Sequence, residues 1–271
     1  MAKGSSVPAV QSEEVIGSNV IPIDFMQEIK QDAGRGYSQD REDASTPQVL
    51  VLQDMSPQVK PRDLGYVEGA VAGDFYIPRL NKLIKGSEGM FVIPAGFGHE
   101  NVEWRPRGQG GIAARYPLGE MPNDVVERLD QNGRPQLVRP NGNTIDETRY
   151  HFVLWEMIGL AIPFRSTGHQ VSKDWTLQMK MMRAEDYTPY PGMAFKWLMT
   201  TRIRTKGENQ WFLPTFTVDC QWKELPTGRK VPIPNVTREE YLAARALANS
   251  IDSGERVVET REEPIQDEIP F

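Results

Sequence analysis

The sequence is poor in residues that stabilise a fold covalently or through metal ions. It contains one cysteine, Cys220, so no disulfide can form within the chain. Its three histidines, His99, His151 and His169, are too scattered for a structural zinc site. No apolar run approaches the roughly 20 residues that a membrane helix requires, and the opening "MAKGSSVPAV" lacks the apolar stretch of a secretory signal. These absences predict a cytoplasmic protein with no membrane partner and no metal.

Motifs of catalysis are missing as well. The segment "HENVE" (99–103) has no second histidine, which a zinc protease motif needs. The phosphate-binding pattern GxxxxGK[ST] does not occur, and no pair of acidic residues stands out as a nuclease site. We therefore expect neither an enzyme nor a cofactor.

Negative charge is concentrated at the two ends of the chain. The formal net charge is −6, but residues 1–45 carry 4 basic and 8 acidic side chains, and residues 255–271 carry 2 basic and 6 acidic ones. The remaining residues, 46–254, therefore hold 25 basic and 23 acidic side chains, a net charge of +2. A mildly basic centre between acidic ends permits nucleic-acid binding despite the overall sign.

The chain divides into three predicted regions. Residues 1–45 are rich in Gly, Ser, Gln and acids and predict a flexible arm, with one apolar island at 20–29. Residues 46–252 predict the folded domain, and residues 253–271 predict an unfolded acidic tail. Within the domain, short β-branched and aromatic runs bounded by Gly and Pro indicate strands. These predicted strands are 47–53, 66–77, 89–96, 101–107, 148–164, 193–206 and 210–222.

Two segments predict helices instead. Residues 172–184 favour a short helix, and residues 237–251 favour a longer one in which Thr237 and Glu240 form a capping box. A mainly β body with an internal helix before the last two strands favours an antiparallel barrel of the oligonucleotide-binding (OB) type, with long loops and a C-terminal helix. A β-sandwich is the alternative.

The predicted strand 195–206 carries the clearest chemical pattern. Side chains alternate between the faces of a strand, so Phe195, Trp197 and Met199 point inward. The opposite face displays four cations, Lys196, Arg202, Arg204 and Lys206. Neighbours on that face lie roughly 6.6 Å apart, close to the phosphate spacing of an extended single strand. The alternative is a solvated edge strand, on which lysines discourage aggregation.

Further basic and aromatic residues could line the same groove. Trp211, on the predicted hairpin partner, would stand beside the cations, where its ring could stack on a base. In the predicted partner strand, Phe212, Phe216, Val218, Cys220 and Trp222 share the other face and are expected in the core. A Gly-rich turn and a second segment add the remaining candidates: Arg105, Arg107, Arg115, Tyr116, Lys82 and Lys85.

The chain ends "EEPIQDEIPF" (262–271), with two acids before Ile-Pro-Phe. This segment resembles the C-terminal tip of bacterial single-stranded DNA-binding proteins. The match covers Asp267, Glu268, Ile269, Pro270 and Phe271. The longer body with its N-terminal arm is more similar to the bacteriophage members of that group, which have an OB barrel and an acidic tail ending in phenylalanine.

The resemblance implies a function and partners. It implies sequence-tolerant binding and protection of single-stranded DNA during phage DNA replication, recombination or repair, in the cytoplasm of a host bacterium. It also implies that the tip recruits replication or repair proteins by inserting Phe271 into an apolar pocket. Homo-oligomers are possible. The alternative function is that of a structural or interaction protein, such as a phage virion component.

Overall fold

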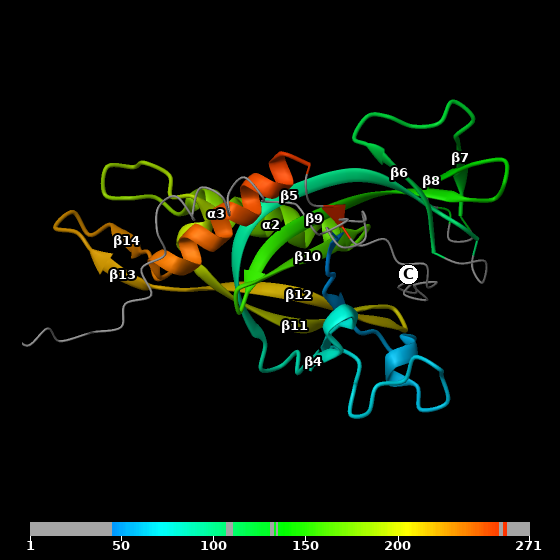
Figure 1. The fold of residues 1–271 in the computed structure, drawn as a ribbon, viewed down its shortest axis with the longest axis horizontal. Coiled ribbons are helices and arrows are strands. Elements are labelled where there is room, and N and C mark those ends of the chain that lie inside the picture. Colours follow the sequence, from blue (N-terminus) through cyan, green and yellow to red (C-terminus); the bar gives the residue numbers. More distant parts are fainter. Residues whose placement is uncertain (1–44, 107–110, 131–132, 134, 255–256, 259–271) are drawn as a thin grey trace, which may run out of the picture. The chain divides into compact units, whose positions relative to one another are not determined.

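The computed structural model describes residues 45–106, 111–130, 133, 135–254 and 257–258 (Figure 1). The chain divides into residues 1–39 and a unit Asp40–Phe271, and every element below belongs to the second unit. The predicted arm, apart from Ser45, and the tip residues Asp267 to Phe271 lie outside the described residues.

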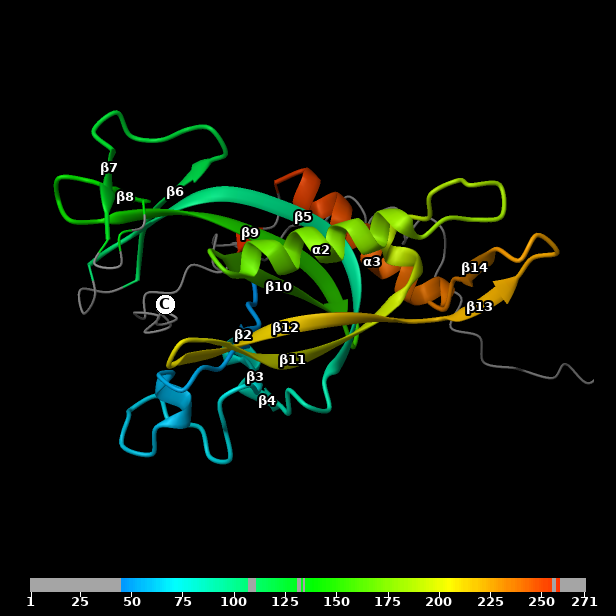
Figure 2. The ribbon, with the colours of Figure 1, turned by 180° about the vertical axis from the view of Figure 1, so that it is seen from behind.

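The main sheet is antiparallel and has eight strands. Its order is β12-β11-β5-β9-β8-β7, with β10 paired to β9 and β6 paired to β5. The strands are β5 (Met90–Trp104), β6 (Ile112–Pro117), β7 (Val126–Leu129), β8 (Pro135–Val138), β9 (Thr144–Trp155), β10 (Ile158–Arg165), β11 (Lys196–Lys206) and β12 (Asn209–Asp219). The long strands β5 and β9 curve strongly in Figures 1 and 2, and the sheet forms an OB-like half-barrel.

The described residues also form three small sheets and three short 3₁₀ turns. One sheet joins β2, β3 and β4, a second joins β13 and β14, and a third pairs β1 with β15 in parallel. The strands are β1 (Ser45–Thr46), β2 (Leu50–Val51), β3 (Phe75–Ile77), β4 (Lys82–Ile84), β13 (Gln221–Glu224), β14 (Lys230–Ile233) and β15 (Val257–Val258). The turns are η1 (Pro57–Val59), η2 (Pro78–Leu80) and η3 (Gly192–Ala194).

Two α-helices cover opposite faces of β5 and β9. On β9, Val153 faces the main core together with Trp175 of helix α2 (Gly168–Met181). The next residue, Leu154, faces the other way and packs near Ala244 of helix α3 (Arg238–Asp252). Because neighbouring residues of a strand point to opposite faces, α2 and α3 lie on opposite sides of this part of the sheet.

The main core is aromatic. The Trp175 ring stacks on Phe216 of β12 with centroids 3.7 Å apart and planes 6° apart, and it meets Trp197 of β11 edge to face at 6.1 Å. This cluster, together with Phe164 of β10, anchors α2 against the concave side of the half-barrel.

The fold class is confirmed: the protein is mainly β, with an antiparallel OB-like barrel, an internal helix and a C-terminal helix. The capping box of α3 is confirmed too. The Thr237 side chain accepts a hydrogen bond from the Glu240 amide at 3.2 Å, and the Thr237 amide donates to the Glu240 carboxylate at 2.8 Å.

Several element predictions were wrong in detail. The predicted strands 89–96 and 101–107 form one bent strand, β5, with a register shift between Pro94 and Gly96. The predicted run 148–164 is the hairpin β9–β10, whose turn consists of Glu156 (φ 46°) and Met157 (φ 66°).

Two predictions about burial and order also fail. Trp222, expected in the core, is 50% exposed because β12 ends at Asp219 and Trp222 lies on β13. The segment predicted to be an unfolded tail included Val257–Val258. These two residues instead form β15, which pairs with Ser45–Thr46 of β1. Burial of Val258 against Tyr150 and Phe152 stabilises this pairing.

Candidate nucleic-acid interface

The cations of β11 lie where the alternating pattern predicts. Trp197 and Met199 are buried in the main core, whereas Arg202, Arg204 and Lys206 belong to the other face and are exposed. Ile203 and Thr205, which alternate with them, are exposed as well, so this end of β11 is open on both faces. In the part of the chain that the structure describes, these three side chains form no ion pair, and we call them the β11 cation row. They are therefore open to an anionic ligand.

Lys196, at the start of β11, was predicted as a fourth member of this row, but it is paired within the fold. Its ammonium group lies 2.7 Å from the Glu240 carboxylate of α3, so its charge is already matched within the fold. Burial alone would raise the pKa of Glu240, but hydrogen bonds from Lys196 and Thr237 outweigh it and lower that pKa.

Trp211 occupies the predicted register position but not the predicted environment. It lies directly opposite Arg204 in the β11–β12 ladder. Its side chain is only 8% exposed and belongs to the main core, so its ring offers no open face for a base in this structure. Strand alternation gives the correct neighbour, but it cannot show that other elements cover the ring.

The basic residues of β4 and the loop after it differ in availability. Lys82 is exposed on β4. Lys85 donates to the buried carboxylate of Asp74 at 2.8 Å and to the Gly69 carbonyl at 2.7 Å. Lys85 therefore secures the loop 69–74, and Lys82 is the more available cation.

The basic and aromatic residues predicted around the Gly-rich turn do not form one exposed surface. Arg105 is exposed, and Arg107 lies outside the described residues. Arg115 pairs with Glu100 across the β5–β6 ladder and also donates to the Tyr150 hydroxyl at 3.2 Å. Tyr116 donates to Glu103. Arg115 and Tyr116 thus hold β6 on β5, and Arg105 is the described member that faces solvent.

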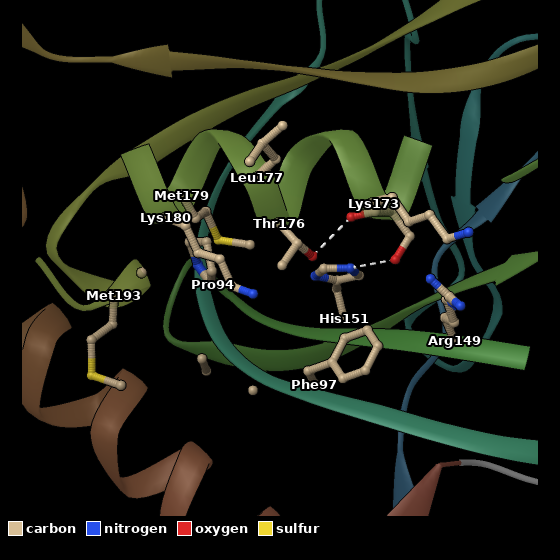
Figure 3. Close-up of a pocket in the computed structure, with 14 residues that line it drawn as sticks. Pro94, Phe97, Arg149, His151, Lys173, Thr176, Leu177, Met179, Lys180 and Met193 are labelled. Atoms are coloured by element: carbon tan, nitrogen blue, oxygen red, sulfur yellow. Dashed lines mark hydrogen bonds between the residues drawn. The ribbon is translucent and has the colours of Figure 1, made fainter. Parts of the chain in front are cut away.

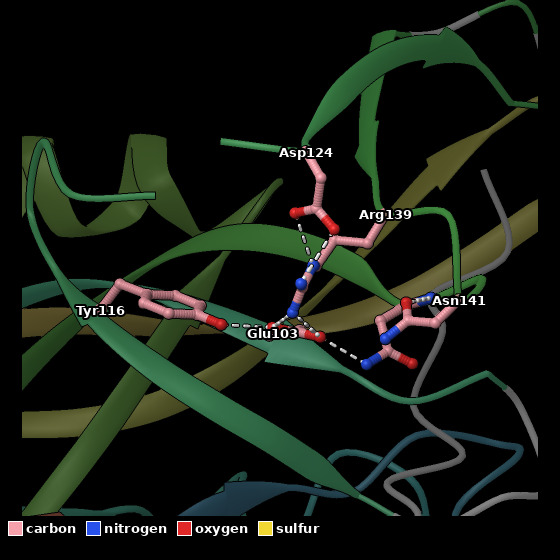
Figure 4. Close-up of polar contacts among 6 residues, drawn as sticks. Glu103, Tyr116, Asp124, Arg139 and Asn141 are labelled. Carbon is pink, nitrogen blue, oxygen red and sulfur yellow. Dashed lines mark hydrogen bonds and ion pairs between the residues drawn. The ribbon is translucent and has the colours of Figure 1, made fainter. Parts of the chain in front are cut away.

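Figure 4 shows the network in which Tyr116 takes part. The Glu103 carboxylate is 2% exposed and accepts hydrogen bonds from Tyr116, Asn143 and Arg139. Burial alone would raise the pKa of Glu103, but these hydrogen bonds outweigh it and hold the pKa below its usual value. The hydrogen bond to Glu103 raises the pKa of Tyr116. Arg139, which directly follows β8, also pairs with Asp124 at 2.9 Å, so the network ties β5 and β6 to the segments after β8 and before β7.

A cavity of about 600 Å³ lies between α2 and the strands β5 and β9 (Figure 3). Sequence reasoning did not identify this site. Its charged lining residues are all cations: Lys173 and Lys180 of α2 and Arg149 of β9. Phe97 of β5 is 50% exposed, and its ring stands edge-on to His151 with centroids 5.2 Å apart. The volume is in the range of small-ligand pockets.

Three polar contacts lie at or beside the inner wall of the cavity. The His151 Nε2 atom lies 2.8 Å from the Ser172 hydroxyl, which joins β9 to α2. Burial and the nearby Arg149 lower the pKa of His151 to about 3, so the ring is neutral at physiological pH. Arg149 donates to Glu147 at 2.8 Å, and His99 lies 2.7 Å from the same carboxylate oxygen. The cavity therefore owes its positive charge to the two lysines and to a partly matched arginine.

The sequence did contain weak signals for this cavity. Lys173 and Lys180 are seven residues apart, which places them on one side of a helix two turns apart. Phe97 is a large aromatic residue flanked by two glycines, Gly96 and Gly98. Neither signal shows that the helix and the strand face each other.

Other kinds of site find no support in the described residues. Within them, no group of three or more His, Cys, Asp or Glu side chains is arranged to hold a metal ion. The helices that the structure describes are all too short or too polar to span a membrane.

Fold and surface together define a mainly β protein with an OB-like half-barrel, an exposed cation row and a cationic cavity. A family model described as Pam3 phage gp34-like protein matches residues 16–257, and the chain belongs to this family. No curated protein and no solved structure matches the chain.

Proposed function

We propose that this protein binds single-stranded DNA with little sequence preference and protects it during phage DNA replication or recombination in the host cytoplasm. The observation that carries the proposal is the β11 cation row, in which Arg202, Arg204 and Lys206 stand exposed on one face of a single strand. The OB-like half-barrel supports it, since such barrels commonly bind oligonucleotides.

The geometry of the row favours phosphates as ligands. Side chains two residues apart on a strand are roughly 6.6 Å apart, so successive cations can each meet a phosphate of an extended strand. Contacts of this kind read no sequence, because every nucleotide carries the same phosphate. They also make the affinity depend strongly on salt.

The proposal extends to the acidic segment that ends the sequence. Residues 267–271, Asp-Glu-Ile-Pro-Phe, match the partner-recruiting tip of bacterial single-stranded DNA-binding proteins. We propose that Phe271 docks in an apolar pocket of replication or repair proteins while Asp267 and Glu268 speed the encounter with basic surfaces.

Fluorescence anisotropy of a labelled oligo-dT of about 20 nucleotides, longer than a typical OB-fold site, tests DNA binding directly. We expect binding at low salt that weakens steeply as salt rises, and weaker binding to a blunt duplex of equal length. An absence of binding at about 50 mM salt, where electrostatic contacts are strong, would rule the function out.

A structural or interaction role is the second candidate, and one observation favours it. Leu118, Met121, Val126 and Leu129 are exposed apolar residues on β7 and on the segment between β6 and β7. Strand β7 ends the main sheet order, so one of its edges has no partner among the described strands. Such an edge can pair with a second copy. Light scattering that shows concentration-dependent assembly, together with no DNA binding, would favour this role.

A further inference from the structure

The cavity between α2 and β5 differs from the β11 cation row in shape and in chemistry. The row is an exposed strip of cations, whereas the cavity combines apolar walls with cations at its rim. Pro94, Met179 and Met193 contribute apolar surface, and none of the described residues that line the cavity is acidic. A ligand that suits it therefore has an apolar part and a negative charge.

Phe97 indicates the form of the apolar part. Its ring lies on the concave side of the sheet, next to His151, yet half of its surface is exposed. Exposed aromatic rings at basic surfaces are the platforms on which unpaired bases stack.

The cations are placed to meet phosphates on either side of such a base. Lys173 and Lys180 are two helical turns apart, about 10 Å along the axis of α2. Figure 3 shows the two lysines spread along this helix, with Phe97 on the strand across from it and Arg149 near the Lys173 end. His151 is neutral and held by Ser172, so it contributes a wall and not a charge.

We propose that this cavity binds one unstacked nucleotide of a single-stranded nucleic acid, with its base on Phe97 and its flanking phosphates near Lys173, Lys180 and Arg149. The inference rests on the proposed function and adds a site to it. A base within a duplex cannot enter, because it is stacked and paired, so the cavity selects single strands over duplexes.

The test compares variants of the full chain in the anisotropy assay with labelled oligo-dT. Phe97→Ala should weaken binding about 5- to 150-fold, the range found when a stacking ring is removed, and should leave the salt slope unchanged. Phe97→Trp should restore the affinity, because a larger ring can also stack. Lys173→Gln with Lys180→Gln should instead reduce the salt slope by about 1.4, since each phosphate contact to a single strand contributes roughly 0.7.

Matched controls show whether the effects belong to the cavity. Trp222 lies on β13, outside the main sheet, and is 50% exposed without lining the cavity, so Trp222→Ala should bind DNA like the wild type. Thermal unfolding of each variant establishes that the fold is kept. An oligonucleotide with a single 4-thiothymidine should cross-link to the peptide that contains Phe97 on irradiation.

The outcomes separate this inference from the proposed function. If the wild type binds no single-stranded DNA, the function itself fails. If the wild type binds, but Phe97→Ala and the double lysine variant stay within twofold of it and cross-links fall elsewhere, the cavity proposal is overturned while the function stands.

Discussion

Removing the β11 cation row should change how DNA binding responds to salt. The perturbation is Arg202→Ala, Arg204→Ala and Lys206→Ala together. All three side chains are exposed, so the free energy of unfolding should change by no more than about 0.5 kcal/mol for each. A loss of binding can then be attributed to the lost charges and not to unfolding.

The size of the effect follows from counterion release. Each phosphate neutralised on a single strand contributes roughly 0.7 to the slope of log affinity against log salt. Three lost contacts should therefore lower the magnitude of that slope by about 2. Between 50 and 200 mM salt, the wild type should lose roughly 16-fold more affinity than the triple variant.

The assay is anisotropy of labelled oligo-dT at a series of salt concentrations. The control variant removes the same charge from other exposed sites, through Lys230→Ala, Arg238→Ala and Arg245→Ala. Both variants share any long-range effect of net charge, so their difference isolates the position of the row. Equal slopes for the two variants would refute the assignment of the row to DNA.

Three further predictions address other parts of the molecule. Deleting residues 262–271 removes four acids, so the affinity for oligo-dT should stay equal or rise, while capture of replication proteins should be lost. A marked fall in the affinity for oligo-dT would contradict the proposed role of this segment in binding partners. Glu103→Gln should destabilise the protein by about 1.5–3 kcal/mol at pH 7 in urea unfolding, because hydrogen bonds to a buried charge are lost. Because the fold lowers the pKa of Glu103, its carboxylate stabilises the protein fully above the pKa that it has in the unfolded chain, and this stabilisation is lost as the pH falls through the folded pKa. A difference in unfolding free energy between the wild type and Glu103→Gln that does not change with pH would argue against this. Replacing Glu156 and Met157 by Asn-Gly should stabilise the β9–β10 turn by about 1–2 kcal/mol in thermal or urea unfolding, because both residues hold positive φ values; no gain would show that the turn is unstrained.

The parts of the fold that the sequence predicts are those governed by local chemistry. The inward face at the start of β11 follows from a period of two, since Trp197 and Met199 are buried while Leu198 between them is not. The start of α3 follows from Thr237 and Glu240, whose side chains form the cap within one turn. In each case the residues that determine the structure are neighbours in the chain.

The parts that escape prediction depend on distant contacts or on unusual turns. The β9–β10 turn uses Glu156 and Met157, which are not typical turn residues, so the run 148–164 gives no sign of a break. Trp211 is buried by elements that its own strand does not specify. The cavity joins Phe97 to Lys173, 76 positions further along the chain, and only the folded sheet brings them together.

The β11 cation row and the cavity are different surfaces, and the length of the bound DNA should show whether one strand occupies both. The row lies on the face of β11 opposite Trp197, whose ring meets Trp175 of α2, while the cavity lies between α2 and β5. An oligonucleotide that is too short to reach both surfaces should respond to Phe97→Ala or to the triple variant, but not to both. OB-type sites span about 4–16 nucleotides, so a series of oligo-dT lengths across this range should include the transition. Above it, both sets of substitutions should weaken binding, because each then removes contacts with the same strand. If even the longest oligonucleotide responds to only one set, the two surfaces bind different ligands, and the strand path proposed for this half-barrel is wrong.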